Sequence, residues 1–323
     1  MLYKSPLVTV IIPTYNRAPF VCEAIDSVLS QTFNDYELIV VDDGSTDNTT
    51  ESLKQYQDKI KYIFQENSGV SSARNAGIKS SNGLWLAFLD SDDEWRPEYL
   101  ATQMDHASQY PEICMQTTDC KLTKGDDHIC TYFQLNGAIE ELRVTDYWLS
   151  VDPFLYVVTH GPWQVGSTIF RRDAITKAGL FDTSLNLAED FDLMARMALQ
   201  GSFGIIRAVL VDMYRREESI ECLTSQIKTS PIQARESEEK MYQKLQRIET
   251  LNDKERKALN RLLASNRRAI ANLLLKNGDI ADAKESYRRA FFTDHSIRSF
   301  AKYFLSLLPE HINLWIIDKN EKL

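Results

Sequence analysis

The sequence has no uninterrupted apolar stretch near the ~18 to 20 residues that a membrane-spanning helix requires. It also lacks a charged N-terminal lead followed by a long apolar region and a small-residue cleavage site. The early run LVTVII (7–12) has only the length of a strand. We therefore expect neither a membrane span nor a signal peptide. The expected location is the cytoplasm, with peripheral contact at the inner face of the membrane left open.

Paired cysteines and an excess of basic residues are missing too. The five cysteines are an odd number and contain no C-x-x-C pair, which favours reduced thiols over a disulfide framework or a zinc cage. The formal net charge is −9, whereas nucleic acid polymers require a basic surface. A nucleic acid polymer is therefore not expected as a partner.

The composition is that of a folded protein, with 43% apolar and 26% charged residues, so disordered and collagen-like classes are excluded. A chain of 323 residues exceeds the size at which a single core usually suffices. Two domains are therefore expected.

The first hundred residues alternate between strand-like and helix-like segments. Apolar, β-branched runs cover 7–12, 37–41, 60–64 and 84–89, and the helix-like stretches cover 18–31, 46–57 and 69–80. This alternation predicts an α/β fold with a doubly wound, mostly parallel sheet. Ligands of such sheets bind at the carboxyl ends of the strands.

The pattern changes beyond about residue 110. Residues 181–202 indicate a loop leading into an amphipathic helix, and 204–215 indicate a strand. We predict a first domain over 1–220, a polar boundary at 216–230, and an α-helical accessory domain over 231–323. Apolar spacing on both sides of Gly278 predicts an αα-hairpin. Six of its residues fall at tetratricopeptide-type spacing: Ala271, Leu274, Gly278, Ala283, Tyr287 and Ala290.

The stretch FLDSDDEW (88–95) carries the most chemistry. A strand ends in crowded acids, and Asp90 and Asp92 can together hold one hard divalent cation, Mn²⁺ or Mg²⁺, that also takes substrate phosphates. The alternative is that Asp92 to Glu94 cap the helix that begins near Pro97.

Three other segments place polar residues at predicted strand ends or a helix start. VIIPTYNR (10–17) contributes Thr14, Tyr15 and Arg17, and the Tyr15 ring can cover a nucleobase. VVDDGSTDNTT (40–50) contributes Asp43, whose carboxylate can accept a base N–H. ENSGVSSARNAGI (66–78) contributes Arg74 near a helix N-terminus that attracts phosphate. The alternatives are a packed loop aromatic, helix caps at Ser45, Thr46 or Asp47, and a surface arginine.

Together with GSTIFRR and AEDFDLMARM, these segments resemble the family 2 glycosyltransferases over about residues 6 to 215. The resemblance implies a GT-A fold and an inverting, metal-dependent glycosyltransferase. The donor would be a nucleotide-diphospho-sugar, by family expectation a UDP-sugar. The product would belong to surface polysaccharide or glycan synthesis, and the acceptor would be a glycan or a lipid-linked sugar.

The resemblance also assigns roles residue by residue. It implies that Pro13, Tyr15 and Asp43 hold the base and that Asp92 is the metal ligand. Arg74, Asp90 and Ser91 would lie by the nucleotide, as would Thr14 and Arg17.

Inversion requires a base that removes the proton of the acceptor hydroxyl. Asp190 matches the catalytic carboxylate of the family, and Glu189 would lie on the acceptor side with Gly166 and Trp163. The alternatives are first-turn acids that favour the dipole of their helix and a core position for Trp163. After the last strand many relatives carry a His where this chain has Glu217, so Arg215 or Arg216 would supply charge to the phosphates instead.

The C-terminal helices are locally basic, with Arg261, Arg267, Arg268, Arg288, Arg289, Arg298 and Lys302. They form either a solvated surface or a docking site for an anionic membrane, with 303–317 in the interface. Two functional alternatives stay open for the chain as a whole. They are a sugar nucleotidyltransferase, against which the loop PTYNR counts, and an inactive sugar-nucleotide-binding scaffold.

Overall fold

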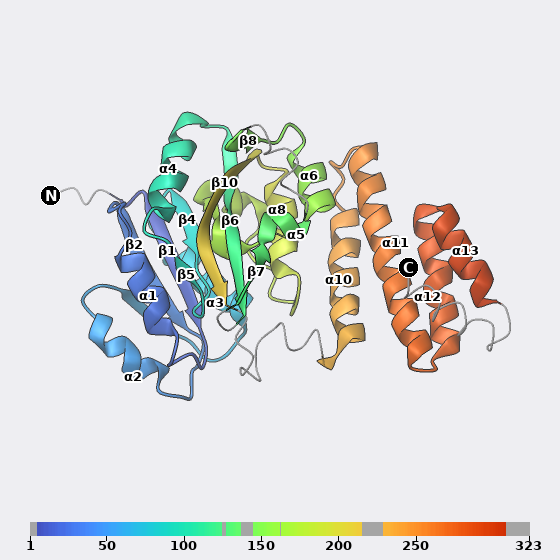
Figure 1. The fold of residues 1–323 in the computed structure, drawn as a ribbon, viewed down its shortest axis with the longest axis horizontal. Helices are drawn as coiled ribbons and strands as arrows, with labels where there is room; N and C mark the ends of the chain where they lie inside the picture. Colours follow the sequence, from blue (N-terminus) through green and yellow to red (C-terminus); the bar gives the residue numbers. More distant parts are fainter. Residues whose placement is uncertain (1–4, 125–126, 137–144, 162, 215–228, 308–323) are drawn as a thin grey trace. The chain divides into compact units, whose positions relative to one another are not determined.

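The computed structural model describes residues 5–124, 127–136, 145–161, 163–214 and 229–307, and the chain divides into two compact units (Figure 1). The first unit comprises residues 1–184 and 189–218, and the second comprises 185–188 and 219–323. None of the helices in the described ranges is both long and apolar enough to cross a membrane.

The first unit is built on one curled sheet with the strand order β3-β2-β1-β4-β9-β6-β10-β5, in which β7 pairs with β6 and β8 with β10 (Figure 1). Its strands are β1 Val8–Thr14, β2 Tyr36–Asp42, β3 Lys61–Phe64, β4 Trp85–Phe88, β5 Glu94–Trp95, β6 Ile113–Lys124, β7 Asp127–Thr131, β8 Tyr147–Leu149, β9 Thr168–Arg171 and β10 Ser202–Tyr214.

The sheet is parallel in its first half and mixed in its second half. Strands β3, β2, β1 and β4 pair in parallel, as the alternation of strands and helices predicts. Strand β9 runs antiparallel to both β4 and β6, whereas β6 and β10 are parallel to each other. The mixed half lies where the sequence loses the regular alternation that parallel crossovers require.

Helices cover both faces of the sheet. They are α1 Val21–Leu29, α2 Thr49–Leu53, α3 Val70–Lys79, α4 Tyr99–Gln109, α5 Tyr132–Asn136, α6 Pro153–His160, α7 Arg172–Ala178 and α8 Glu189–Met197, with 3₁₀ turns at Lys54–Tyr56 and Val165–Ser167. Val10 and Ile12 of β1 share a core cluster with α1 and α4. Ile11 faces α3, where a Cβ on Gly77 would lie 2.5 Å from Ile11 Cγ2. This alternation explains why β1 is buried throughout.

The second unit consists of α10 Pro231–Gln246, α11 Asp253–Lys276, α12 Ile280–Asp294 and α13 Ile297–Ser306. A capping box between Asn252 and Glu255 begins α11. Gly278, with a φ of 86°, turns the chain into α12, and the N–H of Asp279 bonds Leu274 O at 2.9 Å. The predicted αα-hairpin is therefore α11–α12, and Ala271, Ala283 and Tyr287 lie in its core cluster.

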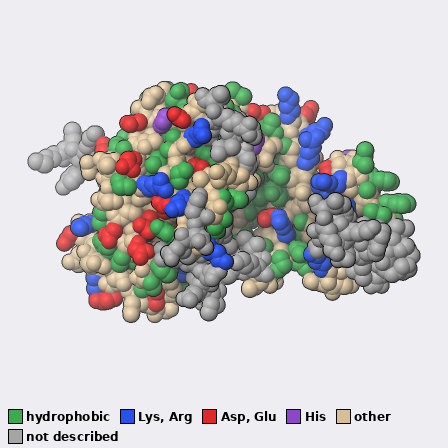
Figure 2. All heavy atoms as spheres, viewed as in Figure 1, with side chains coloured by type: hydrophobic (Ala, Val, Ile, Leu, Met, Phe, Trp, Pro, Cys, Tyr) green, Lys and Arg blue, Asp and Glu red, His purple; other side chains and the backbone are tan. Residues whose placement is uncertain are grey.

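Figure 2 shows Lys and Arg side chains among the acidic ones on the visible face of the first unit.

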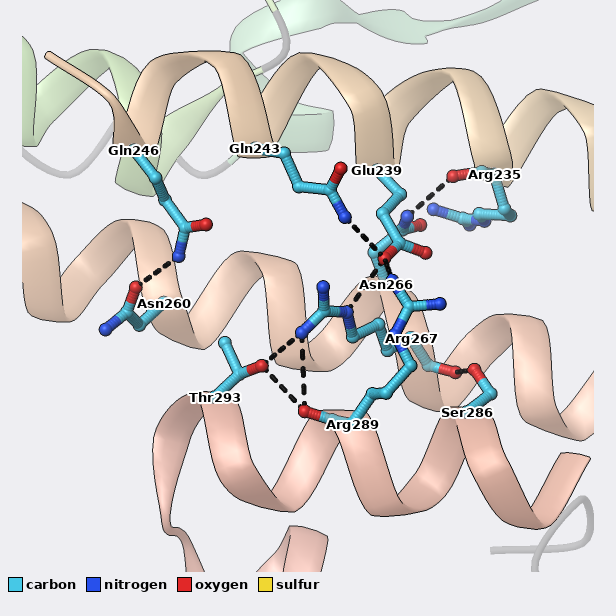
Figure 3. A network of polar contacts seen from close by, with 10 residues as sticks. All are labelled: Arg235, Glu239, Gln243, Gln246, Asn260, Asn266, Arg267, Ser286, Arg289 and Thr293. Carbon is cyan, nitrogen blue, oxygen red and sulfur yellow. Dashed lines mark hydrogen bonds and ion pairs between the residues drawn. The ribbon is translucent and has the colours of Figure 1, made fainter.

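In the second unit, a buried carboxylate joins three helices (Figure 3). Glu239 of α10 accepts hydrogen bonds from Gln243 at 2.9 Å, from Arg267 of α11 at 2.9 Å and from Arg289 of α12 at 2.5 Å. Part of the basic character of these helices is therefore neutralised inside the unit.

Candidate active site

The loops after β1 and β2 are joined by hydrogen bonds. Asn16 has a φ of 51°, a conformation that Asn tolerates better than most residues. Its Oδ1 accepts the N–H of Thr46 at 2.8 Å, and its own N–H donates to Ser45 Oγ at 3.0 Å. The N–H of Arg17 donates to Thr49 Oγ1 at 2.9 Å. These bonds fix the backbone that presents Tyr15 and Arg17 at the carboxyl edge of the sheet.

Asp42 is a structural residue of this edge. It is fully buried, and its carboxylate accepts hydrogen bonds from the backbone of Ser45 at 2.9 Å and from Thr50 and Tyr62 at 3.0 Å each. All three donors lie near the start of α2 or on β3. Asp42 therefore shapes the turn that carries its neighbour Asp43.

Asp43 lies between the end of β1 and the beginning of α3. Its N–H donates to Thr14 O at 2.9 Å, and its carboxylate accepts the N–H groups of Ser68 at 2.9 Å and Gly69 at 2.8 Å, besides Gln65 Nε2 at 2.6 Å. Each carboxylate oxygen has about two acceptor sites, so Oδ2 keeps capacity for a further donor. The structure thus brings Asp43 next to Thr14 and the beginning of α3.

The acids after β4 differ in their environments. Asp93 is buried, and its Oδ1 accepts the N–H of Tyr214 at 3.0 Å, which ties this loop to the end of β10. The side chains of Asp90 and Asp92 remain 39% and 28% exposed. Ser91 between them is buried. Two of the acids are therefore open to a ligand, and the third is a structural residue.

The helix that follows these acids is not capped by them. Helix α4 begins at Tyr99 with Glu98 at its N-cap and no side-chain capping bond, while Glu94 belongs to β5. Asp92 instead lies 3.6 Å from Arg17 Nε through its Oδ2. The helix-cap alternative for Asp92 and Glu94 is therefore not what the structure shows.

Arg74 is the central residue of the site. It is 5% exposed, so it is not a surface residue. Its Nη2 lies 2.9 Å from Asp90 Oδ1, its Nη1 lies 2.9 Å from Glu189 Oε1, and its guanidinium stands 5.2 Å from the ring centroid of Phe181. Burial opposes the charged form of Arg74, but Asp90 and Glu189 raise its pKa above the ordinary value. Arg74 thereby joins the end of β4 to the beginning of α8.

Helix α8 carries three acids in its first turn, with three different environments. Glu189 is buried against Arg74. Asp192 is fully buried and pairs with Arg196 at 2.6 Å, and Arg196 in turn donates to Leu180 O at 2.7 Å. Asp190 is half-buried, and its Oδ1 accepts the N–H of Phe191 at 2.7 Å. Only Asp190 combines access to solvent with freedom from an ion pair among the described residues.

Burial and the neighbouring charge of Glu189 raise the pKa of Asp190 to about 7. The carboxyl of Asp190 therefore binds a proton more tightly in the folded chain than in the unfolded chain. Its ionised form costs stability above pH 7, and this cost disappears as the pH falls toward 4.

We therefore predict that Asp190→Asn raises the free energy of unfolding by about 1 to 2 kcal/mol at pH 8 without added metal, a value discounted for partial exposure. The gain should shrink progressively between pH 7 and pH 4. Urea unfolding at several pH values in EDTA measures both features. A destabilised variant at pH 8 would contradict the assigned environment of Asp190.

The residues predicted for the acceptor side divide into two groups. Trp163 is 1% exposed and packs edge-on against Phe133 and Phe203. The structure therefore places it in the core, the alternative that the sequence left open. Gly166 lies in the turn Val165–Ser167, where nothing stands within 4 Å of an added Cβ, and its carbonyl accepts the indole N–H of Trp95 at 2.8 Å.

Two features of the site were not expected from the sequence. Asn16 organises the first two loops, and only its Asn identity next to a strand end hints at the left-handed backbone. Asn75 exchanges two hydrogen bonds with the backbone of Phe181, at 2.8 and 3.0 Å, which holds that ring against Arg74. Glu217, Arg215 and Arg216 lie outside the described residues.

A hard cation is the metal that the donor set suits. Asp90 and Asp92 offer only carboxylate oxygens, and no group of three or more His, Cys, Asp or Glu side chains that could hold a metal ion occurs in the described part of the chain. Mg²⁺ and Mn²⁺ are commonly held by one or two carboxylates together with substrate phosphates. The residues present therefore fit a divalent cation that arrives with a phosphorylated ligand.

Comparison with known protein families gives one family match, "Glycosyl transferase family 2", over residues 9–154. The uncharacterized glycosyltransferase RP339 of Rickettsia prowazekii is 34% identical over 211 residues, covering 64% of this chain and 63% of its own length. The putative teichuronic acid biosynthesis glycosyltransferase TuaG of Bacillus subtilis is 41% identical over 105 residues, covering 31% of this chain and 42% of its own length.

Two solved structures share the fold. S. aureus TarS 1-349 in complex with UDP-GlcNAc has a TM-score of 0.68 at 19% identity, covering 96% of this chain and 88% of its own. The mannosyltransferase PcManGT from Pyrobaculum calidifontis, in complex with GDP-Man and Mn²⁺, has a TM-score of 0.58 at 19% identity, covering 93% and 79%. The predicted GT-A fold with a C-terminal helical region is thereby confirmed.

Proposed function

We propose, because residues 9–154 match the model of glycosyl transferase family 2, that this protein transfers a sugar from a nucleotide-diphospho-sugar to a hydroxyl group of an acceptor. One observation carries the proposal: the contacts Arg74–Asp90, Arg74–Glu189 and Arg17–Asp92 gather these residues at one edge of the sheet. That edge is where ligands of open α/β sheets bind.

The donor is proposed to lie along the ends of β1, β2 and β4. Pro13, Tyr15 and Asp43 would hold the base, with Oδ2 of Asp43 as the acceptor for a base N–H. Two buried polar atoms near this region, Thr14 Oγ1 and Arg74 Nε, have no hydrogen-bond partner among the described residues. Buried polar atoms are normally satisfied, so both suit a polar ligand such as a ribose or a phosphate.

Asp92 is proposed as the metal ligand, with Asp90 and Ser91 beside the nucleotide. When bound, Mn²⁺ or Mg²⁺ would stabilise the negative charge of the departing diphosphate. Arg17 lies 3.6 Å from Asp92 and contributes positive charge at the same place. The chain itself orients the donor through the backbone of the loops that follow β1 and β4.

Transfer is proposed to proceed by direct displacement with inversion. The acceptor oxygen forms a bond to the anomeric carbon while the bond from that carbon to the diphosphate breaks, and the acceptor proton passes to a carboxylate of Asp190. A pKa of about 7 suits a general base at neutral pH. Glu189, held by Arg74, would fix the position of Asp190 on α8.

The acceptor is proposed to be a glycan or a lipid-linked sugar in surface polysaccharide synthesis. The name of TuaG, which refers to teichuronic acid biosynthesis, supports this class. UDP is the proposed nucleotide, in line with the ligand of TarS, and GDP, the nucleotide in the PcManGT complex, is the comparison in the test.

A thermal-shift screen tests this function. UDP, GDP and dTDP sugars are added to the protein with Mn²⁺ or with EDTA, and a ligand at ~100 times its Kd stabilises a protein by about 2.7 kcal/mol. We expect one nucleotide class to raise the Tm only with metal, and Asp92→Asn to remove most of that rise. A rise with every nucleotide, or one that EDTA leaves unchanged, would contradict the proposed site.

A turnover assay distinguishes the proposed enzyme from an inactive sugar-nucleotide-binding scaffold. Release of the nucleoside diphosphate from the bound donor, measured with a mixture of glycan acceptors, is expected from an active enzyme. Donor binding without release under any acceptor supports the inactive sugar-nucleotide-binding scaffold instead.

A further inference from the structure

Gln65 connects three elements at the carboxyl edge of the sheet. It follows β3, and its backbone N–H donates to Asp42 O at 3.0 Å, which continues the pairing of β3 with β2. Its side-chain Nε2 donates to Asp43 Oδ1 at 2.6 Å and to Ser72 Oγ of α3 at 3.2 Å. The amide nitrogen must face Asp43, because an ionised carboxylate only accepts hydrogen bonds and would repel the amide oxygen. Both N–H groups of the Gln65 amide are therefore in use.

The carboxylate of Asp43 is almost saturated with donors. Its Oδ1 accepts Gln65 Nε2 at 2.6 Å and the N–H of Ser68 at 2.9 Å. Among the residues that the structure describes, Oδ2 accepts only the N–H of Gly69, at 2.8 Å. Because each carboxylate oxygen has about two acceptor sites, Oδ1 is filled and Oδ2 keeps one. Asp43 is 3% exposed, so only a small part of its carboxylate can meet a ligand.

The donors to Asp43 are held by backbone that packs closely on the turn after β2. Gly44 has a φ of 81°, and a Cβ there would lie only 2.7 Å from the backbone nitrogen of Asn67. Ser68 and Gly69 donate through main-chain N–H groups, which no side-chain substitution removes. Gln65 is the one of these three donors that a substitution can delete.

Nucleobases differ in the number of donors that they present to such an acceptor. Uracil and thymine carry a single N–H, at N3, whereas guanine carries a ring N–H at N1 and the adjacent 2-amino group. With one acceptor site left, Asp43 satisfies the single N–H of uracil. Guanine bound in the same way would leave its amino group without a partner, and an unsatisfied buried donor weakens binding by about tenfold or more.

We propose that Gln65 is a specificity-determining residue that acts through Asp43. By occupying an acceptor site on Oδ1, Gln65 leaves room for one base N–H and so selects uridine or thymidine diphosphates against guanosine diphosphate. Deleting the Gln65 side chain vacates that site, and the amino group of guanine can then donate to Oδ1. Because Asp43 holds the base only in the proposed donor site, this role of Gln65 rests on the proposed function.

Calorimetric titration of the full chain with nucleoside diphosphates and Mn²⁺ tests the role of Gln65. The probes are UDP, GDP and inosine diphosphate, whose base is guanine without the amino group. We expect the unchanged protein to bind UDP at least about tenfold more tightly than GDP, and to bind inosine diphosphate more tightly than GDP by a similar factor. The last comparison holds the size of the base constant, so it reports the amino group alone.

Gln65→Ala should relax this selection. We expect the ratio of the GDP and UDP dissociation constants to fall by about tenfold, because the guanine amino group gains an acceptor. GDP and inosine diphosphate should then bind with nearly equal affinity. A purely structural role of Gln65 would weaken the binding of UDP and GDP by the same factor and leave the ratio unchanged.

Two control variants separate the occupied acceptor from a general disturbance. Ser72→Ala removes the other partner of the Gln65 amide but keeps the bond from Gln65 to Asp43, so the ratio of the two dissociation constants should stay the same. Gln109→Ala removes an amide that donates to Asp105 O at 3.1 Å in α4. This second variant should bind UDP and GDP as the unchanged protein does.

The outcomes distinguish the role of Gln65 from the proposed function. Absence of binding by every nucleotide would overturn the proposed function and the role of Gln65 with it. With UDP binding retained, equal affinities of the unchanged protein for UDP and GDP, or for GDP and inosine diphosphate, would overturn the role of Gln65 alone. These comparisons need no substitution, so they decide the matter even if Gln65→Ala does not fold. A ratio that Gln65→Ala leaves unchanged would also overturn it.

Discussion

Asp190→Asn is expected to lower kcat by about a thousandfold, within the range that general-base catalysis contributes. The amide keeps the shape of the carboxyl and can still accept the N–H of Phe191, but it cannot take the proton of the acceptor hydroxyl. Donor affinity should change little, because the residues proposed to hold the nucleotide lie at the ends of β1, β2 and β4. Initial rates and donor titration on the same preparation measure both quantities.

The pattern of losses identifies the role. Asp192→Asn is the matched control on the same helix. Asp192 is fully buried and pairs with Arg196, so replacing it should lower the Tm. Asp190→Asn should not lower the Tm. Retained turnover in Asp190→Asn, or an equal loss of donor binding, would remove Asp190 from the role of base.

Arg74→Met is expected to be strongly destabilising, by about 3 to 5 kcal/mol, because it breaks a buried ion pair and leaves one partner without compensation. Glu189 has 8% of its side chain exposed and faces Arg74 at 2.9 Å. Without Arg74 its charge is buried with no guanidinium opposite. The methionine fills most of the volume, so the effect reports charge more than a cavity. Chemical denaturation measures the change in free energy of unfolding.

Two further variants distinguish this explanation from a packing defect. Arg74→Met/Glu189→Gln should recover part of the lost stability, because the uncompensated charge is gone. Lys54→Met removes an ion pair with Glu51 whose partners are 66% and 70% exposed, and it should change stability by no more than about 1 kcal/mol. Equal losses in Arg74→Met and the double variant would show that packing, and not charge, determines the effect.

The elements of the first unit follow from local signals in the sequence. Strands expected at 7–12 and 37–41 are observed at Val8–Thr14 and Tyr36–Asp42, and the helix expected at 69–80 is observed at Val70–Lys79. Continuous β-branched runs indicate buried strands directly. No local signal in the sequence predicts that β9 runs antiparallel to its neighbours, because strand direction depends on contacts that are distant in sequence.

The candidate site was predictable as a set of strand ends but not in its contacts. The position of Asp90 and Asp92 after a buried strand was visible in the sequence. The structural role of Asp93 was not visible, because its carboxylate accepts the N–H of Tyr214, which is 121 residues away in sequence. Trp163 illustrates the same limit, because an aromatic residue beside a glycine has the same sequence whether it lines a cleft or fills a core.

A crystal structure of the protein with a nucleoside diphosphate and Mn²⁺ tests the central claim most directly. Anomalous scattering locates the manganese without reference to any assumed ligand. We predict one manganese peak about 2.1 Å from a carboxylate oxygen of Asp92, with diphosphate oxygens on its other side. A manganese ion bound away from the loop after β4, or a nucleotide bound at another edge of the sheet, would contradict it.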